Sequence, residues 1–370
     1  MPSKIRIGLI GLSTGSQGTN WAVQAHLPTC NPRKSAKKSI EQYSLDPSTK
    51  TYDSPHDLAK DDEVDLVVCV VGVERHYELL LPAVEAGKNV YTELPLASDM
   101  GKIHELVKKA EEKGIKTAFG MQGRTSPVTQ LVKNIIAEGK IGRVLSTTWT
   151  GAAGPLGEKP VPVGMKYLTQ RAAGGNFTTV WFLHSINYII EVLGELDAFS
   201  SVLGNQRTSI DVIDPKQDGK KVETAQKDTP DQILLQGRFQ SGALISYHLR
   251  GGDAFPDTPG VTWTIYGEKG EIVITNPFPM LDIVHQGIKI KLQQFGQEVK
   301  DMEVPEDWMS DIKHPAQNIG RIYEAYAKGE EGTYPDWKVA LRRHELIEEM
   351  WNRADGEKPF GEKAKYLGKA

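Results

Sequence analysis

Cysteine is scarce in this 370-residue chain, and its scarcity narrows the classes of protein to consider. The two cysteines, Cys30 and Cys69, lie in neither a CxxC motif nor a metal-ligand spacing. We therefore expect no disulfide framework, no structural zinc and no other metal site. A reducing compartment fits this composition.

Long hydrophobic runs are also missing. The longest, residues 66–71, is about a third of the roughly 20 residues that a membrane helix needs, and it fits a buried strand instead. Residues 1–7 contain no apolar core of a signal peptide. We expect a cytoplasmic protein without membrane contact.

Charge of one sign is not in excess either, because 44 Lys and Arg residues stand against 48 Asp and Glu residues. The formal net charge of -4 gives no electrostatic reason to expect a nucleic acid or an anionic membrane surface as partner. A small-molecule substrate is the expected partner. Because single hydrophobic cores stop growing at roughly 250–300 residues, we also expect two domains.

What the sequence does contain is an alternation of strand and helix patterns up to residue 123. The expected strands are residues 4–10, 64–70, 89–93 and 115–120, and the expected helices are residues 21–27, 76–86 and 103–112. This alternation predicts an α/β domain over residues 1–123, a Rossmann-like parallel sheet with helices on both faces.

The second strand of that sheet is short or missing. Residues 28–52 are polar and contain no run of four apolar residues, which leaves at most a few residues around Cys30 for the strand. A truncated gene model and a natural trimming of the domain explain this pattern equally well.

The pattern changes after residue 123. A helix is expected over 127–137 and closing helices over 316–327 and 336–353, and the strand patterns between them cover residues 144–150, 196–203, 232–239, 243–249, 261–266 and 271–275. We predict an α+β domain over residues 124–370 with a large, mainly antiparallel open sheet. Residues 205–231 include eleven charged residues and fit a solvent-exposed hairpin.

The first expected strand ends in an altered glycine-rich loop, "IGLIGLSTGSQG" over residues 7–18. Gly11 supplies the glycine of the tight turn, and a serine stands where the second glycine of a dinucleotide fingerprint is usual. Backbone amides at a helix start bind phosphate whatever the side chains are. The expected phosphate contacts are Gly11, Ser13, Thr14, Gly15 and Gln17. Glycine-rich turns also occur in sheets that bind nothing.

The nucleotide preference depends on a residue that is missing. No acidic side chain follows about 20 residues after the loop, where one would hold the ribose hydroxyls of NAD. Arg33 and Lys34 occupy that region, and a cationic pair suits the 2′-phosphate of NADP. The expected cofactor is NAD or NADP, with a slight preference for NADP. The alternative is that both residues are solvated on a polar helix.

Three stretches carry a family resemblance. "VDLVVCVVGVERHYELLLPAVEAGKNVYTELPLA" (64–97), "GMQGRTSPVTQLVKNIIAEGKIGRV" (120–144) and "IYGEKGEIVI" (265–274) resemble the Gfo/Idh/MocA oxidoreductase family. The loop, "HLP" after the first helix, "MQGR" and "GGNFTTVWFLH" resemble the branch that contains the fungal galactose-regulon repressor and its oxidoreductase-like relatives.

The resemblance implies NAD or NADP, a sugar or polyol substrate, and a homodimer through the C-terminal sheet. It also implies that the last helix, 336–353, packs back toward the first domain. It extends the expected cofactor contacts to the ends of later strands: Val71, Gly72, Glu93, Leu94, Gln122 and Arg124. His76 is expected there too, because it follows a strand at the carboxyl edge of the sheet.

The catalytic pattern of the family is incomplete in this chain. Leu94 stands where the family has a lysine, and Val180 stands where it has an aspartate, whereas His184 is retained. Transfer of a hydride to or from a carbinol needs a positioned acid or base, and His184 is the expected one. Lys166 and Tyr167 are the nearest ionisable substitutes. A buried core histidine, and a surface lysine beside a packed tyrosine, are the structural alternatives.

Three functions follow from these residues. The first is an NAD(P)-dependent oxidoreductase acting on a small hydroxylated or carbonyl substrate. The second is a non-catalytic regulator that binds a dinucleotide, which the missing lysine and aspartate favour. The third is a protein that has lost nucleotide binding with its shortened second strand.

Overall fold

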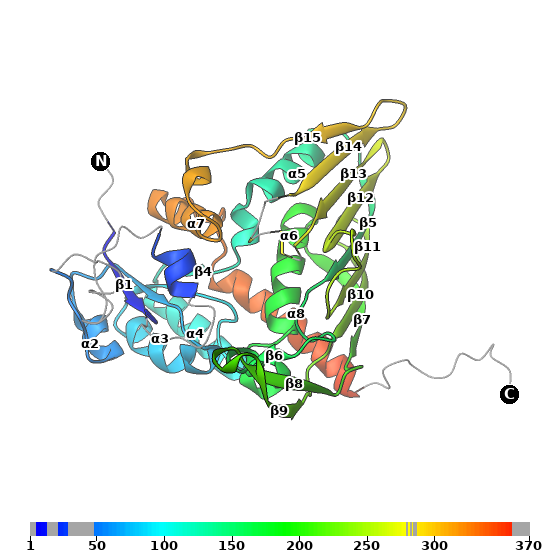
Figure 1. The fold of residues 1–370 in the computed structure, drawn as a ribbon. Helices are drawn as coiled ribbons and strands as arrows, with labels where there is room; N and C mark the ends of the chain where they lie inside the picture. Colours follow the sequence, from blue (N-terminus) through cyan, green and yellow to red (C-terminus); the bar gives the residue numbers. More distant parts are fainter. Residues whose placement is uncertain are drawn as a thin grey trace.

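The structure is a computed structural model that describes residues 5–12, 21–28, 48–278, 280, 281, 283 and 287–356. It consists of an N-terminal domain built on a small sheet and a C-terminal domain built on a large one (Figure 1). The segment expected to hold the second strand lies mostly outside the described residues. In the described part of the chain, no helix combines the length and the apolar character needed to span a bilayer.

The N-terminal sheet is parallel. Its strands lie side by side in chain order, β1 (Ile7–Ile10), β2 (Leu66–Cys69), β3 (Asn89–Thr92) and β4 (Thr117–Phe119). All four residues of β2 are buried, as expected for a strand covered on both faces. The predicted Rossmann-like sheet is therefore confirmed.

Helices connect these strands: α2 (Pro55–Lys60), α3 (His76–Glu85) and α4 (Met100–Lys113). The ends of α4 show why the sequence folds locally in this way. The Asp99 side chain accepts a hydrogen bond from the Lys102 amide at the start, and Gly114 adopts the left-handed conformation at the end.

The C-terminal sheet has eight strands in the order β15-β14-β13-β12-β5-β11-β10-β7. Their bounds are β5 (Val144–Ala152), β7 (Leu196–Gly204), β10 (Gln232–Phe239), β11 (Leu244–Arg250), β12 (Val261–Gly267), β13 (Gly270–Asn276), β14 (Lys289–Gln294) and β15 (Lys300–Met302). Only β5 and β11 pair in parallel; every other pair in this sheet is antiparallel. The predicted large, mainly antiparallel sheet is confirmed, although the strand patterns did not reveal β14 and β15.

Two helices, α5 (Pro127–Ala137) and α6 (Leu183–Leu193), cover one face of the large sheet, and Figure 1 shows the other face open. A small sheet, β6-β8-β9, forms from β6 (Val161–Pro162), β8 (Ser209–Asp214) and β9 (Lys220–Gln226). Strands β8 and β9 are the hairpin expected within the charged stretch.

The last helix, α8 (Trp337–Gly356), lies between the two domains and packs on α4, β4 and β7. The Trp337 amide donates to Thr117 Oγ1 at 3.0 Å, and the Phe119 amide donates to the Pro335 carbonyl at 2.8 Å. Both ends of β4 are therefore held by the segment where α8 begins.

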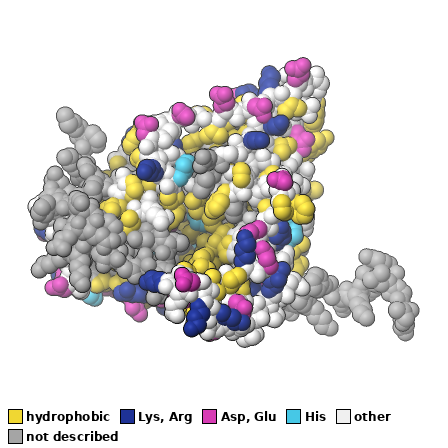
Figure 2. Space-filling view, in the orientation of Figure 1, with side chains coloured by type: hydrophobic (Ala, Val, Ile, Leu, Met, Phe, Trp, Pro, Cys, Tyr) yellow, Lys and Arg dark blue, Asp and Glu magenta, His cyan; other side chains and the backbone are white. Residues whose placement is uncertain are grey.

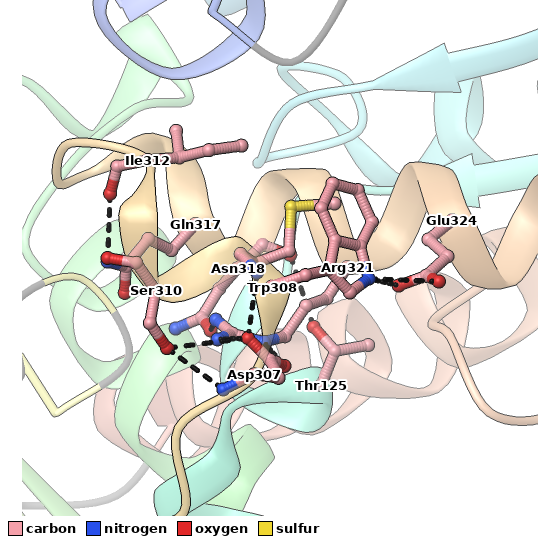
Figure 3. Close-up of polar contacts among 10 residues, drawn as sticks. Thr125, Asp307, Trp308, Ser310, Ile312, Gln317, Asn318, Arg321 and Glu324 are labelled. Atoms are coloured by element: carbon pink, nitrogen blue, oxygen red, sulfur yellow. Dashed lines mark hydrogen bonds and ion pairs between the residues drawn. The ribbon is translucent and has the colours of Figure 1, made fainter.

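Helix α7 (Ala316–Lys328) links the short 3₁₀ turn η8 (Trp308–Asp311) to the 3₁₀ turn η3 (Gln122–Thr125). Figure 3 shows Arg321 of α7 between Asp307 and Asn318. Thr125 Oγ1 donates to the carbonyls of Gln122 and Asn318 at 3.1 and 3.2 Å. Through these hydrogen bonds, α7 and η8 hold η3 in place.

Candidate functional site

The candidate site is a crevice between the carboxyl ends of the four parallel strands and helix α6. In open parallel sheets, ligands bind outside the carboxyl ends of the strands. Figure 2 shows a hollow between the two domains, lined largely by hydrophobic side chains. Four segments leave the strand ends at this edge, and each supplies predicted site residues.

Gly11, directly after β1, can only be glycine. Its φ is +113°, and a Cβ atom there would lie 1.9 Å from the Val70 carbonyl oxygen. The backbone therefore turns away tightly from the sheet, as the predicted phosphate loop requires. Ser13, Thr14, Gly15 and Gln17 lie outside the described residues.

His76, the first residue of α3, joins the segment after β2 to the segment after β3. Its Nε2 lies 3.1 Å from the Val71 carbonyl oxygen and its Nδ1 lies 2.9 Å from the Pro95 carbonyl oxygen. Burial lowers the pKa of His76. A neutral imidazole carries a single N–H, so His76 donates a hydrogen bond to one of these two carbonyls and lies close to the other. His76 thereby joins the segment that contains Val71 to the segment that contains Pro95.

Glu93, after β3, is held within a group of buried aromatic side chains. Its Oε1 lies 2.8 Å from His26 Nε2 and accepts a hydrogen bond from the Tyr91 hydroxyl at 3.1 Å. The other ring nitrogen of His26 lies 2.8 Å from the Tyr323 hydroxyl. A Cβ atom at Gly120 would lie 2.5 Å from the Glu93 carboxylate, so glycine there makes room for it.

His344 of α8 holds the same segment from the opposite domain. Its Nδ1 donates to the Ala340 carbonyl at 2.7 Å, so Nε2 is free to accept the Leu96 amide at 3.3 Å. Burial lowers the pKa of His344 to about 4. His26 and His344 were not predicted as site residues, because their partners are 67 and 248 residues away along the chain.

Gln122 and Arg124, which follow β4, differ in whether their side chains have partners. Gln122 is fully buried, and neither its amide nitrogen nor its amide oxygen has a partner among the described residues. Arg124 Nε lies 2.9 Å from a Glu191 carboxylate oxygen of α6, and Lys133 pairs with the same carboxylate. The structure therefore places Arg124 in an ion-pair cluster and leaves Gln122 able to bind a ligand.

Helix α6, with the π-helical segment η6 (Thr178–Phe182) before it, has two distinct sides. The Ser185 hydroxyl lies 2.7 Å from the Tyr247 hydroxyl, and Trp149 Nε1 donates to the Tyr188 hydroxyl at 2.8 Å, so this side faces the sheet. Glu191 faces η3 instead, where it binds Arg124.

The catalytic candidate His184 lies on the side of α6 that faces η3. Val180, His184, Asn187 and Glu191 recur at spacings of four, three and four, which places them on one side of a helix. His184 is buried, with 5% of its surface exposed. Asn187 is also buried, and its Nδ2 has no acceptor among the described residues. Sequence reasoning did not identify Asn187.

The other two catalytic candidates differ in their surroundings. Lys166 Nζ lies 2.6 Å from a Glu223 carboxylate oxygen of β9, which directs this lysine to the small sheet. Tyr167 lies beside Gly175, which is also in contact with Val73 of the first domain. Burial, and then the negative charge of Glu74, raise the pKa of Tyr167, although 43% of its surface is exposed. Tyr167 thus lies at the rim of the crevice.

The two replaced positions are apolar and half-buried. Leu94 packs against the main hydrophobic core, and Val180 lies on the same side of the helix as His184. Neither side chain can carry a proton. Within the described residues, no group of three or more His, Cys, Asp and Glu side chains is arranged to hold a metal ion.

Comparisons with known proteins match both halves of the chain. The model of the Gfo/Idh/MocA oxidoreductase family with an NAD-binding Rossmann fold matches residues 5–121, and the model of the Gal80p C-terminal domain matches residues 127–276. Dehydrogenase aclE from Aspergillus oryzae is 30% identical over 318 residues, which cover 80% of this chain and 83% of that protein.

A regulatory protein is also similar. The galactose/lactose metabolism regulatory protein GAL80 of Saccharomyces cerevisiae is 26% identical over 72% of this chain and 66% of that protein. The crystal structure of a super-repressor mutant of Gal80p from Saccharomyces cerevisiae superposes with a TM-score of 0.84 at 22% identity, over 96% of this chain and 97% of that one. Levoglucosan dehydrogenase in complex with NADH and L-sorbose superposes with a TM-score of 0.75 at 18% identity, over 95% and 97%. At these identities the two structures show the fold.

Proposed function

The chain belongs to the Gfo/Idh/MocA oxidoreductase family, and on that premise we propose that it is an NAD(P)-dependent oxidoreductase. It transfers a hydride to or from a carbinol or carbonyl carbon of a small sugar- or polyol-like substrate. His184 moves the accompanying proton.

The described residues fit a dinucleotide. The turn at Gly11 has no room for a side chain, because a Cβ atom would meet the Val70 carbonyl, and a tight turn of this kind is what the first glycine of a dinucleotide loop supplies. Farther along the same edge, Thr92 Oγ1 and the Gln122 amide are buried without partners among the described residues. Buried polar groups that lack partners are rare, and a ligand at this edge would supply them.

The nicotinamide, when bound, supplies the hydride acceptor or donor. The chain itself holds Val71 and Pro95 in fixed positions through His76, and it holds Leu96 through His344. These contacts give the crevice a defined shape before a ligand enters. The apolar side chains of Leu94 and Val180 cannot take part in proton transfer, which leaves that role to His184.

The observation that carries the proposal is the side of α6 on which His184 lies. The helix directs it toward η3, at the domain boundary, whereas Lys166 is bound to Glu223 on the small sheet. His184 is therefore the predicted acid or base that faces the crevice.

The test is turnover of NAD or NADP against a panel of sugars and polyols, with His184→Gln compared with Lys166→Met. A positioned acid or base contributes typically 10²- to 10⁴-fold, so His184→Gln should slow the reaction by that factor and leave NADH binding unchanged. Lys166→Met should behave like the wild type. Equal rates for His184→Gln and the wild type would remove His184 from the mechanism.

A second function is favoured by the two apolar replacements and by the match to the Gal80p C-terminal domain. In this proposal the chain is a regulator whose interface responds to a bound dinucleotide, without turnover. Single-turnover assays distinguish the two functions: binding of NAD or NADP with no hydride transfer to any panel member supports the regulator.

Three finer properties remain part of the proposal. A slight preference for NADP follows from Arg33 and Lys34, and parallel titrations with NADH and NADPH test it. A homodimer through the open face of the large sheet fits the lack of helices on that face among the described residues, and light scattering tests it (Figure 1). A cytoplasmic location is tested by fluorescence microscopy of a tagged chain.

A further inference from the structure

We propose that a cavity at the amino end of β4 is a second ligand site, which binds a small organic cation: an ammonium group on an apolar body. The cavity lies between the C-terminal half of α4, the residues that lead into β4 and the start of α8. The crevice of the proposed function lies at the carboxyl ends of the strands, so this site goes beyond that function.

The cavity has the size and the apolar lining of a small-molecule site. Its volume is about 410 Å³, and ligand sites in proteins typically measure roughly 300–1,000 Å³. Its apolar lining consists of Val107, Ala110, Ile115, Tyr334 and Trp337. All of these but the half-buried Ile115 are buried. The cavity therefore offers a firmly packed and partly aromatic surface to the body of a ligand.

Five charged side chains also line the cavity, and four of them are paired with each other. Lys116 Nζ lies 2.9 Å from a Glu331 carboxylate oxygen, and Lys338 Nζ lies 3.2 Å from a Glu111 carboxylate oxygen. The fifth, Asp336, forms no ion pair with any described residue. The lining therefore carries one uncompensated negative charge.

Asp336 is also the residue that caps α8, and capping leaves part of its carboxylate unused. Its Oδ1 accepts a hydrogen bond from the Val339 amide at 2.8 Å. The second oxygen of an ionised carboxylate remains able to accept from a cationic donor. The negative end of α4, at Gly114 beside the cavity, offsets the positive end of α8. The charge of Asp336 thus decides which ligands the cavity attracts.

The aromatic side chains next to Asp336 favour the same kind of ligand. Tyr334 and Trp337 flank it along the chain and line the same cavity. Burial, and then the negative charges of Glu331 and Asp336, raise the pKa of Tyr334 to about 12, so its ring is a neutral phenol. Electron-rich rings attract organic ammonium ions, and a carboxylate adds to this attraction. An anionic ligand would instead be repelled by Asp336.

The experiment titrates the full chain with three probes of similar shape and different charge: phenethylamine, phenethyl alcohol and 3-phenylpropionate. The readouts are the melting temperature and the indole N–H signal of Trp337 in a proton–nitrogen correlation spectrum, assigned with Trp337→Phe. Trp337 lines the cavity, and its Nε1 has no acceptor among the described residues, so a ligand there should move this signal. Phenethylamine should shift the signal and raise the melting temperature. The alcohol should bind about tenfold more weakly, and 3-phenylpropionate should change neither readout.

A substitution at Asp336 separates its charge from its capping role. Asp336→Asn removes the charge and keeps the cap, because asparagine caps helices about as well as aspartate. It should weaken phenethylamine binding about tenfold. The matched control is Asp99→Asn, because Asp99 caps α4 through the Lys102 amide and does not line this cavity. The control should bind phenethylamine like the wild type, and both variants should melt close to the wild type without ligand.

Three outcomes overturn the inference: no binding of phenethylamine, equally tight binding of the alcohol or of 3-phenylpropionate, or phenethylamine binding that Asp336→Asn leaves unchanged. A parallel titration with NADH and NADPH tests the proposed function separately. A chain that binds phenethylamine through Asp336 and binds neither nucleotide keeps this site and loses the proposed function.

Discussion

The segments that follow β3 and β4 leave neighbouring strands of one sheet, yet they use their polar groups in opposite ways. Three buried histidines hold residues 93–98, and each engages the segment with a ring nitrogen. Residues 120–126 are held through the backbone by Thr125, whereas the Gln122 amide has no described partner. The first segment has a fixed shape, and the second keeps hydrogen-bonding capacity for a ligand.

This difference teaches how a chain with an incomplete catalytic pattern can keep the framework of a binding site. A site needs rigid walls and a few polar groups that the fold does not use itself. Here histidine, which often serves as an acid or base, supplies the rigidity at three positions. His184 differs from His26, His76 and His344, because it lies on α6 of the C-terminal domain, on the opposite side of the crevice.

The largest expected effect is on the more rigid segment. His76→Leu removes the hydrogen bond to one of the Val71 and Pro95 carbonyls and places an apolar side chain against both. We expect a loss of about 3–4 kcal/mol in the free energy of unfolding. Urea unfolding measures this. The exposed His56 is the matched control, and His56→Leu should change stability by less than about 0.5 kcal/mol. Similar losses for the two variants would show that His76 does not hold the segment.

A pH titration of stability sharpens the comparison. His344 is neutral in the fold, with a pKa of about 4 against 6.5 when unfolded. The contribution of neutral His344 to the free energy of unfolding is fully present above pH 6.5. It is lost as the pH falls toward 4, because in that range the imidazole binds a proton in the unfolded chain but not in the folded one. The expected loss is about 3 kcal/mol, and it should be absent in His344→Gln. Equal pH profiles for the variant and the wild type would contradict this role.

A smaller effect on stability is expected at α7, which supports residues 120–126 through Asn318. Arg321→Met removes three hydrogen bonds to Asp307 and Asn318 and should cost about 1–2 kcal/mol. It should also weaken NAD binding, because Asn318 helps to hold Thr125. Arg143, which pairs with Glu268 at the surface, is the control: Arg143→Met should change neither quantity measurably. If Arg321→Met leaves nucleotide binding unchanged, the contacts of η8 do not support the candidate site.

The smallest effect is expected for Lys166→Met. Its ion pair with Glu223 is partly exposed on both sides, and such pairs contribute less than about 1 kcal/mol. Thermal unfolding should detect little change. A large loss of stability would show that the small sheet depends on this pair.

The regular elements could be predicted from the sequence, because their signals are local. The expected helix over 127–137 agrees with α5, and the expected strand over 232–239 agrees with β10. The short strands β14 and β15 were missed, because alternation over a few residues beside polar stretches gives a weak signal.

The candidate site was predictable only in part. The tight turn at Gly11 was evident, because a glycine directly after a buried strand is typical of a sharp change in chain direction. The ion pair of Lys166 with Glu223 was not, since 57 residues separate the two along the chain. The unpaired amide of Asn187 was equally hidden, because its orientation depends on which side of α6 faces the sheet.

The position of α8 has a consequence for the order in which the protein is made. The ribosome releases β1–β4 long before α8, so the nascent N-terminal sheet lacks His344 at Leu96 and the α8 backbone donor at Thr117. The sheet can pair its strands at that stage, but the segment after β3 gains its final shape only when the last described helix docks. Acquisition of the proposed nucleotide binding should therefore be a late event of synthesis.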